Sequence, residues 1–229
     1  MLQLVIANRN YSSWSLRAWL YLAESGIEFE EIRIPLFTDQ WREEIARYSP
    51  VGRVPVLIDD GFSIWDSTAI IEYAREQFPG AVDWPEDHKQ RAHARSISAE
   101  MHSGFLALRD ELPQNLRARC PLDTQSLGEE CRQQIQRVDQ SWSECRNENR
   151  SSGNWLFGTF SIAEVLFAPV ALRFVTYEIA VSPEAGEFMD AVCGLQSVQQ
   201  WIAAAREEKE SSSFIDQRIP ASETDLTLG

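Results

Sequence analysis

Three short polar motifs in the first third of the chain carry the residues best suited to chemistry. The first is Tyr11-Ser12-Ser13-Trp14-Ser15, which directly precedes a helical pattern. Its hydroxyl groups stand beside free backbone N–H groups at the positive end of a helix dipole, a place that stabilises a phosphate, a carboxylate or a thiolate. An ordinary serine N-cap would use the same residues. The motif alone therefore leaves an anion site and a helix cap both open.

The other two motifs are Val54-Pro55, at the start of a strand pattern, and Asp66-Ser67, at the start of a helical pattern. A trans proline is ordinary at a strand start, whereas a cis bond would turn the Val54 N–H and C=O outward as an edge for a peptide-like ligand. Asp66 is a good helix cap, or it attracts an ammonium group while Ser67 and the helix N-terminus receive a carboxylate. Together the three motifs would suit a small zwitterionic peptide that carries a thiol.

The periodicity of the sequence predicts the elements that position these motifs. Residues 2–6 form a short apolar run typical of a buried strand, and apolar residues then recur at helical spacing from Leu16 to Ala23, before Gly26. The pattern continues with a strand over 29–34, a helix over 39–48, a hairpin of strands 54–58 and 62–64, and a helix from Asp66. The predicted order is βαβαββα.

Beyond Pro85 the strand pattern disappears and only helical stripes follow. One stripe runs over 97–112 through Met101 and Phe105, and another runs over 127–145. Further helices are predicted over 161–180, 183–194 and 196–207, with a loosely held tail after Ser211. We therefore expect an α/β domain over 1–80 and an all-helical domain over 86–229.

Charge and composition exclude several classes of partner. The 229 residues carry 21 Lys plus Arg against 35 Asp plus Glu, and a net charge of −14 repels nucleic acid and anionic lipid. No apolar run is long enough for a membrane span, and the first residues lack the features of a signal peptide. The four cysteines form no C-x-x-C pair and the three histidines no metal-binding spacing. We expect a cytoplasmic protein with reduced thiols and no metal.

The element order and the three motifs together resemble the cytosolic glutathione transferases, in particular bacterial serine-type members, over both domains. The resemblance implies a thioredoxin-like N-terminal domain and a C-terminal helical bundle. Ser161 and Glu164 look like the family's capping box, with Glu164 where the family usually has Asp.

Ser12-Ser13-Trp14-Ser15-Leu16-Arg17 is similar, without gaps, to the Ser-Ser-Cys-Ser-x-Arg motif of the zeta class. The resemblance implies that Ser12 activates the thiol of glutathione through a hydrogen bond, with Ser13 as an alternative. Lowering a thiol pKa from about 8.5 by about two units takes roughly 2.7 kcal/mol, within reach of one hydrogen bond and a helix end. We expect Ser12→Ala to leave folding nearly intact, because Ser13 is available as a cap.

The resemblance also assigns the rest of the site. Val54, ahead of Pro55, would pair with the cysteinyl backbone of glutathione, Asp66 and Ser67 would hold the γ-glutamyl end, and Gln40 would contact the glycyl end. The electrophile would lie between the domains, against Tyr11, Met101, His102, Phe105 and Arg109. Arg173 would anchor an acidic co-substrate, or it is a surface or dimer-contact residue.

The implied activity is a glutathione transferase that uses glutathione as a co-substrate and a small electrophile as its partner, in a homodimer. A glutathione-dependent cis–trans isomerase of the maleylacetoacetate isomerase kind is an alternative, although Trp14 replaces the cysteine of the zeta motif. A non-catalytic glutathione-binding or protein-interaction module is another. Chemistry that needs a protein sulfur nucleophile is disfavoured, because no cysteine lies near Ser12.

Overall fold

The structure, a computed structural model, describes residues 1–216 and begins with a four-stranded mixed sheet. Its elements are β1 (Leu2–Ile6), α1 (Ser13–Glu24), β2 (Glu30–Arg33), α2 (Trp41–Ile45), β3 (Val56–Asp59), β4 (Phe62–Trp65) and α3 (Ser67–Gln77). The strand order is β2-β1-β3-β4, with β1 parallel to β2 and antiparallel to β3. The predicted βαβαββα order and thioredoxin-like domain are confirmed, although α2 is shorter than the predicted 39–48.

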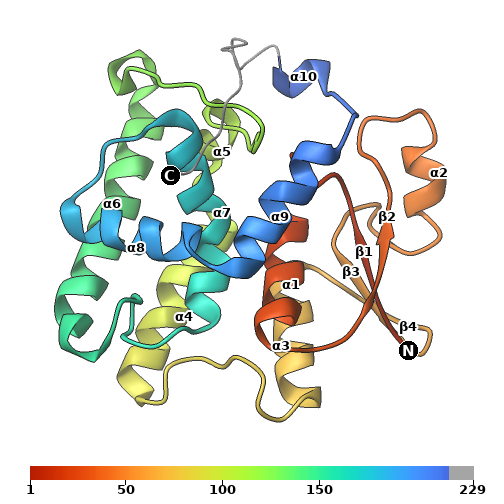
Figure 1. Cartoon of the computed structure of the whole chain (residues 1–229), viewed down its shortest axis with the longest axis horizontal. Helices are drawn as coiled ribbons and strands as arrows, with labels where there is room; N and C mark the ends of the chain where they lie inside the picture. The colour runs from red at the N-terminus through yellow and green to blue at the C-terminus, as the bar shows by residue number, and fades with distance from the viewer. Residues whose placement is uncertain (217–229) are drawn as a thin grey trace.

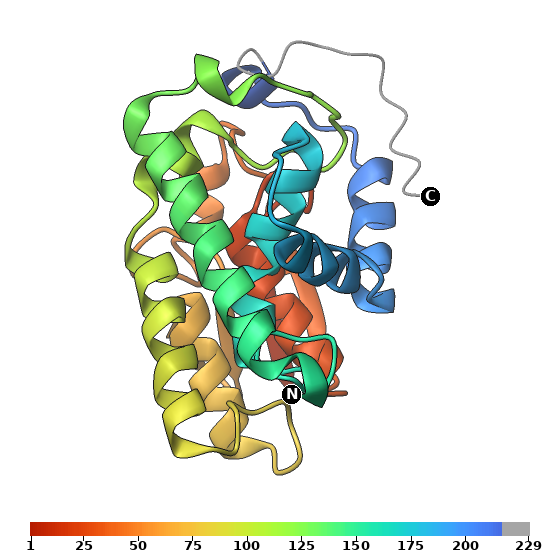
Figure 2. The ribbon, with the colours of Figure 1, turned by 90° about the vertical axis from the view of Figure 1, so that its left-hand side faces the viewer.

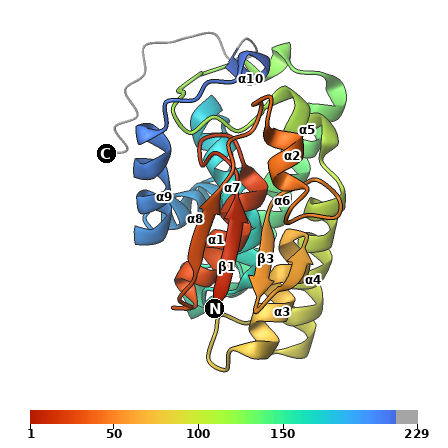
Figure 3. The same ribbon diagram turned by 90° about the vertical axis from the view of Figure 1, so that its right-hand side faces the viewer.

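Alternation along β1 divides the apolar residues between the two faces of the sheet. Leu4 and Ile6 join the main core, whereas Val5 belongs to a small second cluster with Ile45 of α2. Helices α1 and α3 therefore lie on the face towards the rest of the chain, and α2 covers the other face (Figures 1 and 3). The carboxyl half of the chain packs on α1 and α3.

That half is helical, as expected. It contains α4 (His88–Ser103), α5 (Leu106–Glu111), α6 (Glu129–Asn149), α7 (Ile162–Tyr177), α8 (Pro183–Cys193), α9 (Gln196–Glu207) and α10 (Ser213–Asp216), with short 3-10 turns η1 (Thr124–Ser126) and η2 (Arg150–Ser152). Every residue of α7 except Val175 is buried, and the long helices α4 and α6 lie beside it (Figure 2). Within residues 1–216, no helix has the length and hydrophobicity to cross a membrane.

The predicted stripe over 97–112 is two helices, because the chain breaks at Gly104 and Phe105. Phe105 has a left-handed backbone with φ of 56°. The guanidinium of Arg109 donates hydrogen bonds to the carbonyl groups of Met101, His102 and Gly104, so it caps the end of α4. Side-chain periodicity continues through such a break, and therefore did not reveal it.

Two further predictions concern helix ends. The capping box of Ser161 and Glu164 is confirmed: the Glu164 carboxylate accepts from the N–H groups of Ser161 and Leu156 at 2.8 and 2.9 Å. The prediction of a loose tail after Ser211 was wrong as far as Asp216, because Ser212 is buried and its N–H donates to the Tyr11 hydroxyl at 3.1 Å. The remainder of that predicted tail, 217–229, lies outside the described residues.

Candidate functional site

Ser12 is the N-cap of α1 and is almost completely buried. Its Oγ accepts a hydrogen bond from the Ser15 N–H at 3.2 Å and donates one to the Ser15 Oγ at 2.8 Å. Ser15 in turn accepts from the Ala7 N–H at 3.1 Å. The Ser12 hydroxyl therefore stands at the positive end of the α1 dipole, hydrogen-bonded to the Ser15 side chain.

Ser13 begins α1 and binds the helical domain. Its Oγ accepts a hydrogen bond from Arg173 Nη2 at 3.0 Å, so Ser13 does not cap the helix. Because Arg173 supplies the hydrogen of that bond, Ser13 keeps its own hydrogen for another acceptor, and no such acceptor occurs among residues 1–216.

Arg173 is buried, which excludes the alternative that it is a surface arginine. Its guanidinium also donates to the carbonyl groups of Leu112 and Pro169, at 3.0 and 3.3 Å. Burial, together with the nearby charge of Arg109, lowers the pKa of Arg173 to about 10. Arg173 therefore links α7 to the segment after α5 and to the N-terminus of α1.

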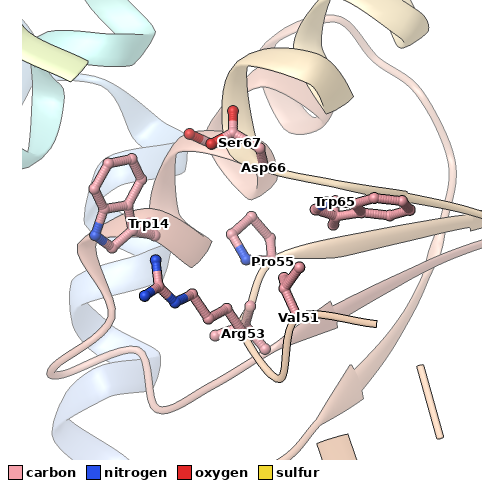
Figure 4. Close-up of a pocket in the computed structure, with 8 residues that line it drawn as sticks. Trp14, Val51, Arg53, Pro55, Trp65, Asp66 and Ser67 are labelled. Carbon is pink, nitrogen blue, oxygen red and sulfur yellow. The ribbon is translucent and has the colours of Figure 1, made fainter. Parts of the chain in front are cut away.

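A cavity of about 520 Å³ lies beside the N-terminus of α1 (Figure 4). Trp14 and Trp65 stand at opposite ends of it, with Pro55, Asp66 and Ser67 between them. Its lining comprises Trp14, Val51, Arg53, Val54, Pro55, Trp65, Asp66 and Ser67. The cavity brings the second and third sequence motifs together next to the helix that carries the first.

The Val54–Pro55 and Asp66-Ser67 motifs each have an unusual backbone geometry at this cavity. The Val54–Pro55 peptide bond is cis, the alternative that the sequence left open. Asp66 has a φ of 74°, in the left-handed region that non-glycine residues rarely adopt and that is concentrated at functional sites.

Asp66 and Ser67 present two different polar groups to the cavity. The Oδ1 of Asp66 accepts from the N–H groups of Thr68 and Ala69 at 2.8 and 3.4 Å, which caps α3. The Ser67 side chain is fully buried, and its Oγ has no hydrogen-bond partner within residues 1–216. Because Ser67 also lines the cavity, its unpartnered hydroxyl is available to a group bound there.

The pKa of Asp66 is lowered although its carboxyl group is partly desolvated. Burial alone would raise the pKa of this carboxyl, but the hydrogen bond and charge of His102 and the two backbone N–H groups of α3 outweigh it. His102 Nε2 lies 3.1 Å from Asp66 Oδ2. Asp66 is therefore ionised at neutral pH and supplies the cavity with a negative charge.

At its end of the cavity, Trp14 packs against two arginines and a histidine. The guanidinium carbons of Arg17 and Arg109 lie 4.4 and 5.1 Å from the centre of the Trp14 ring, and the His102 ring meets it edge-on at 5.0 Å. Arg17 is buried with its Nη1 unpartnered by any described residue, and burial lowers its pKa well below the usual value. Three buried or half-buried arginines, Arg17, Arg109 and Arg173, thus gather on the interior side of the site in a chain whose net charge is −14.

The residues expected around the electrophile have other contacts and do not line this cavity. Met101 is buried, with its Sδ 2.8 Å from Arg17 Nη2, and Phe105 occupies the break after α4. The Tyr11 hydroxyl accepts from Arg117 Nη2 at 2.8 Å and donates to the Asp216 carboxylate at 3.0 Å. Gln40 is exposed at the start of α2 and is also absent from the cavity wall.

His102 lines a second cavity of about 480 Å³ between α3 and α4. Its wall includes Thr68, Glu72, Trp84, Arg95 and Ser98. Asp66 lines the first cavity and His102 the second, and the two side chains are paired at 3.1 Å.

Arg53 and Trp65 are cavity residues that the sequence analysis missed. Arg53 extends its guanidinium towards Trp14 along the wall (Figure 4), and Trp65 is 44% exposed. Both directly precede a motif that the sequence did identify, Val54-Pro55 or Asp66-Ser67, and that adjacency was the available signal. Gln114 was also missed: both polar atoms of its buried amide lack a partner among residues 1–216.

Comparison with known proteins agrees with this geometry. Residues 11–77 match the family described as glutathione S-transferase, N-terminal domain. Maleylacetoacetate isomerase from Rattus norvegicus is 37% identical over 105 residues, covering 44% of this chain and 48% of the relative. The probable maleylacetoacetate isomerase of Caenorhabditis elegans is 34% identical over 100 residues, covering 44% and 46%. The chain thus spans about half the length of these curated relatives.

Solved structures extend the likeness in fold to almost the whole chain. A glutathione transferase homolog from Burkholderia GL BGR1, determined with bound glutathione, superposes with a TM-score of 0.69 and 25% sequence identity. That alignment covers 90% of this chain and 99% of the other. The architecture is therefore that of a thioredoxin-like domain followed by a helical domain, as in the glutathione S-transferases.

Proposed function

We propose that this chain, which has the fold of the glutathione S-transferases and matches their N-terminal domain family, is a serine-type, zeta-like glutathione transferase. It activates the thiol of glutathione for attack on a small electrophile. The observation that carries the proposal is the buried, unpartnered Ser67 hydroxyl in the wall of a cavity that also holds Asp66.

The charges of the cavity suit the groups of glutathione. Asp66 would hold the ammonium of the γ-glutamyl end, while Ser67 and the N-terminus of α3 would receive its carboxylate. The Val54 backbone, held by the bond to Pro55, would pair with the cysteinyl unit. At the glycyl end, the exposed guanidinium of Arg53 suits a carboxylate, and we retain Gln40 as a second contact.

Thiol activation would take place at the N-terminus of α1. In our proposal Ser12 turns its hydroxyl from Ser15 to the sulfur, and the helix dipole and the buried guanidinium groups stabilise the resulting thiolate. Ser13 is the alternative donor, because its hydrogen has no described acceptor. The electrophile would lie on the helical-domain side, near Tyr11, Met101, Phe105 and Arg109.

A glutathione-dependent cis–trans isomerase is the second candidate. The match to two proteins named as maleylacetoacetate isomerases favours it, and the buried charge of Arg173 suits an acidic co-substrate. Trp14 argues against it, because it replaces the thiol of the zeta motif. We also propose that the protein is a cytoplasmic homodimer. Analytical ultracentrifugation tests the oligomeric state.

The decisive test is the pKa of glutathione bound to the purified protein, measured by ultraviolet thiolate absorbance across pH. A serine-type transferase gives a bound thiol pKa about two units below the free value of about 8.5, and Ser12→Ala restores it upwards. Saturable binding without a shift supports a non-catalytic binding module instead. Absence of binding refutes the glutathione assignment altogether.

A further inference from the structure

We propose that His102 is a positioning residue for the amino end of glutathione, acting from the helical domain through Asp66. This inference rests on the proposed function and assigns His102 to the γ-glutamyl end of the site in place of the electrophile side. Its basis is the pair formed by His102 Nε2 and Asp66 Oδ2 at 3.1 Å.

The Asp66 carboxylate is held by two separate parts of the chain. Its Oδ1 is fixed by two N–H groups of its own helix, and its Oδ2 by His102 of α4. Among the pairs that the structure describes within residues 1–216, His102 is the one side chain paired with this carboxylate, its Nε2 lying 3.1 Å from Oδ2. Each carboxylate oxygen can accept more than one hydrogen bond, so the carboxylate remains able to receive an ammonium group.

Two contacts hold the His102 ring in place. Thr68 Oγ1 lies 3.0 Å from His102 Nδ1, and the ring packs edge-on against Trp14 with centroids 5.0 Å apart. When the Thr68 hydroxyl donates to Nδ1, the proton of a neutral imidazole resides on Nε2 and points at Asp66. In the charged imidazole Nε2 also carries a proton, so a proton lies between Nε2 and the Asp66 carboxylate in either form.

The backbone of Asp66 explains why such a support is useful. With a φ of 74°, Asp66 has a conformation that persists only when its surroundings hold it. The side chain is also 44% exposed, so packing alone does not fix the orientation of its carboxylate. The bond to His102 couples that orientation to α4, and a ligand ammonium then meets a carboxylate that is already positioned.

The test compares His102→Leu with His102→Gln, using glutathione and the analogue that lacks the glutamyl amino group. Gln retains an N–H donor near the position of Nε2, whereas Leu keeps the bulk and has no donor. We expect His102→Leu to raise the Kd and KM for glutathione about tenfold, with kcat at saturation nearly unchanged. The Kd of the deamino analogue should change less than about twofold, and His102→Gln should recover most of the loss.

An equal loss for both ligands would mean that His102 only supports the fold, and the inference would be wrong. A Gln variant as weak as the Leu variant, or a Leu variant like the wild type, would overturn it as well. The variant Asp66→Asn distinguishes a failure of the role of Asp66 from a failure of the role of His102. If neither the wild type nor Asp66→Asn binds glutathione more tightly than the deamino analogue, the assignment of Asp66 to the glutamyl amine fails. If only Asp66→Asn loses the preference for glutathione, the role of His102 fails and the proposed function stands.

Discussion

Replacing Ser12 by alanine removes two hydrogen bonds at the start of α1. One is the cap from the Ser15 N–H at 3.2 Å and the other is the bond to the Ser15 Oγ at 2.8 Å. Loss of a serine N-cap costs about 1 kcal/mol, and loss of the second, buried hydrogen bond costs about 1 kcal/mol more. We therefore expect the free energy of unfolding to fall by about 2 kcal/mol.

Urea unfolding followed by circular dichroism measures this loss. With an m value of about 3 kcal/mol per molar urea for a chain of this size, the midpoint should fall by about 0.7 M. Ser13 does not take over the cap, because its Oγ is engaged by Arg173 and it lies one residue inside the helix. This corrects the expectation that Ser12→Ala leaves folding intact.

Ser182→Ala is a matched control for the same loss elsewhere. Ser182 is the N-cap of α8, accepts from the Ala185 N–H at 3.4 Å and donates to Asp139 Oδ1 at 2.7 Å. Both variants should lose similar stability, but only Ser12→Ala should raise the pKa of bound glutathione. An unchanged urea midpoint in Ser12→Ala would refute the hydrogen-bond reasoning, and an equal rise in thiol pKa in both variants would refute the role of Ser12 in activation.

Three further predictions concern Glu164, which is buried, and Ser67 and Arg53, which line the cavity. Burial raises the pKa of Glu164 to about 7, above the value of about 4.3 in an unfolded chain, so its contribution to stability declines as pH rises from about 4.3 to about 7. Urea unfolding at pH 5 and pH 8 should show a smaller decline in Glu164→Gln than in the wild type. Ser67→Ala should change the free energy of unfolding by less than about 0.5 kcal/mol, because no described group bonds its Oγ, yet weaken glutathione binding in calorimetry about tenfold. Arg53→Leu should weaken glutathione binding and make its Kd less sensitive to salt. Calorimetry at low and high NaCl measures this, and the same change in Kd with salt for both proteins would contradict the prediction.

Local pattern was sufficient to predict the elements of the fold and two of the cavity motifs. The apolar run over 2–6 and the helical spacing from Leu16 predicted the first strand and helix, and Asp66-Ser67 was identifiable as a helix start. These features depend on neighbours in the sequence. The division at 80 and 86 and the roles of the site residues stay predictions.

The partners of the arginines could not be predicted in this way. Arg109 caps α4, and Arg173 binds Ser13, which lies 160 positions away in the sequence. Periodicity indicates which face of a helix is buried, but it does not indicate which group a long polar side chain hydrogen-bonds across the boundary between two domains. The break at Gly104 escaped detection for a related reason, because the apolar residues on both sides of it still face one core.

The arginines at this boundary also influence how the protein unfolds. Arg17 joins α1 to α7 through the Leu166 carbonyl at 3.0 Å, and Arg173 joins α7 back to α1 through Ser13. Most buried apolar residues of both halves form one continuous cluster, and the small cluster of Val5 and Ile45 under α2 is separate from it. Separating the halves would expose that cluster and strip buried guanidinium groups of their acceptors. We therefore expect the two domains to unfold in a single cooperative transition, so that the free energy measured for any variant refers to the whole chain.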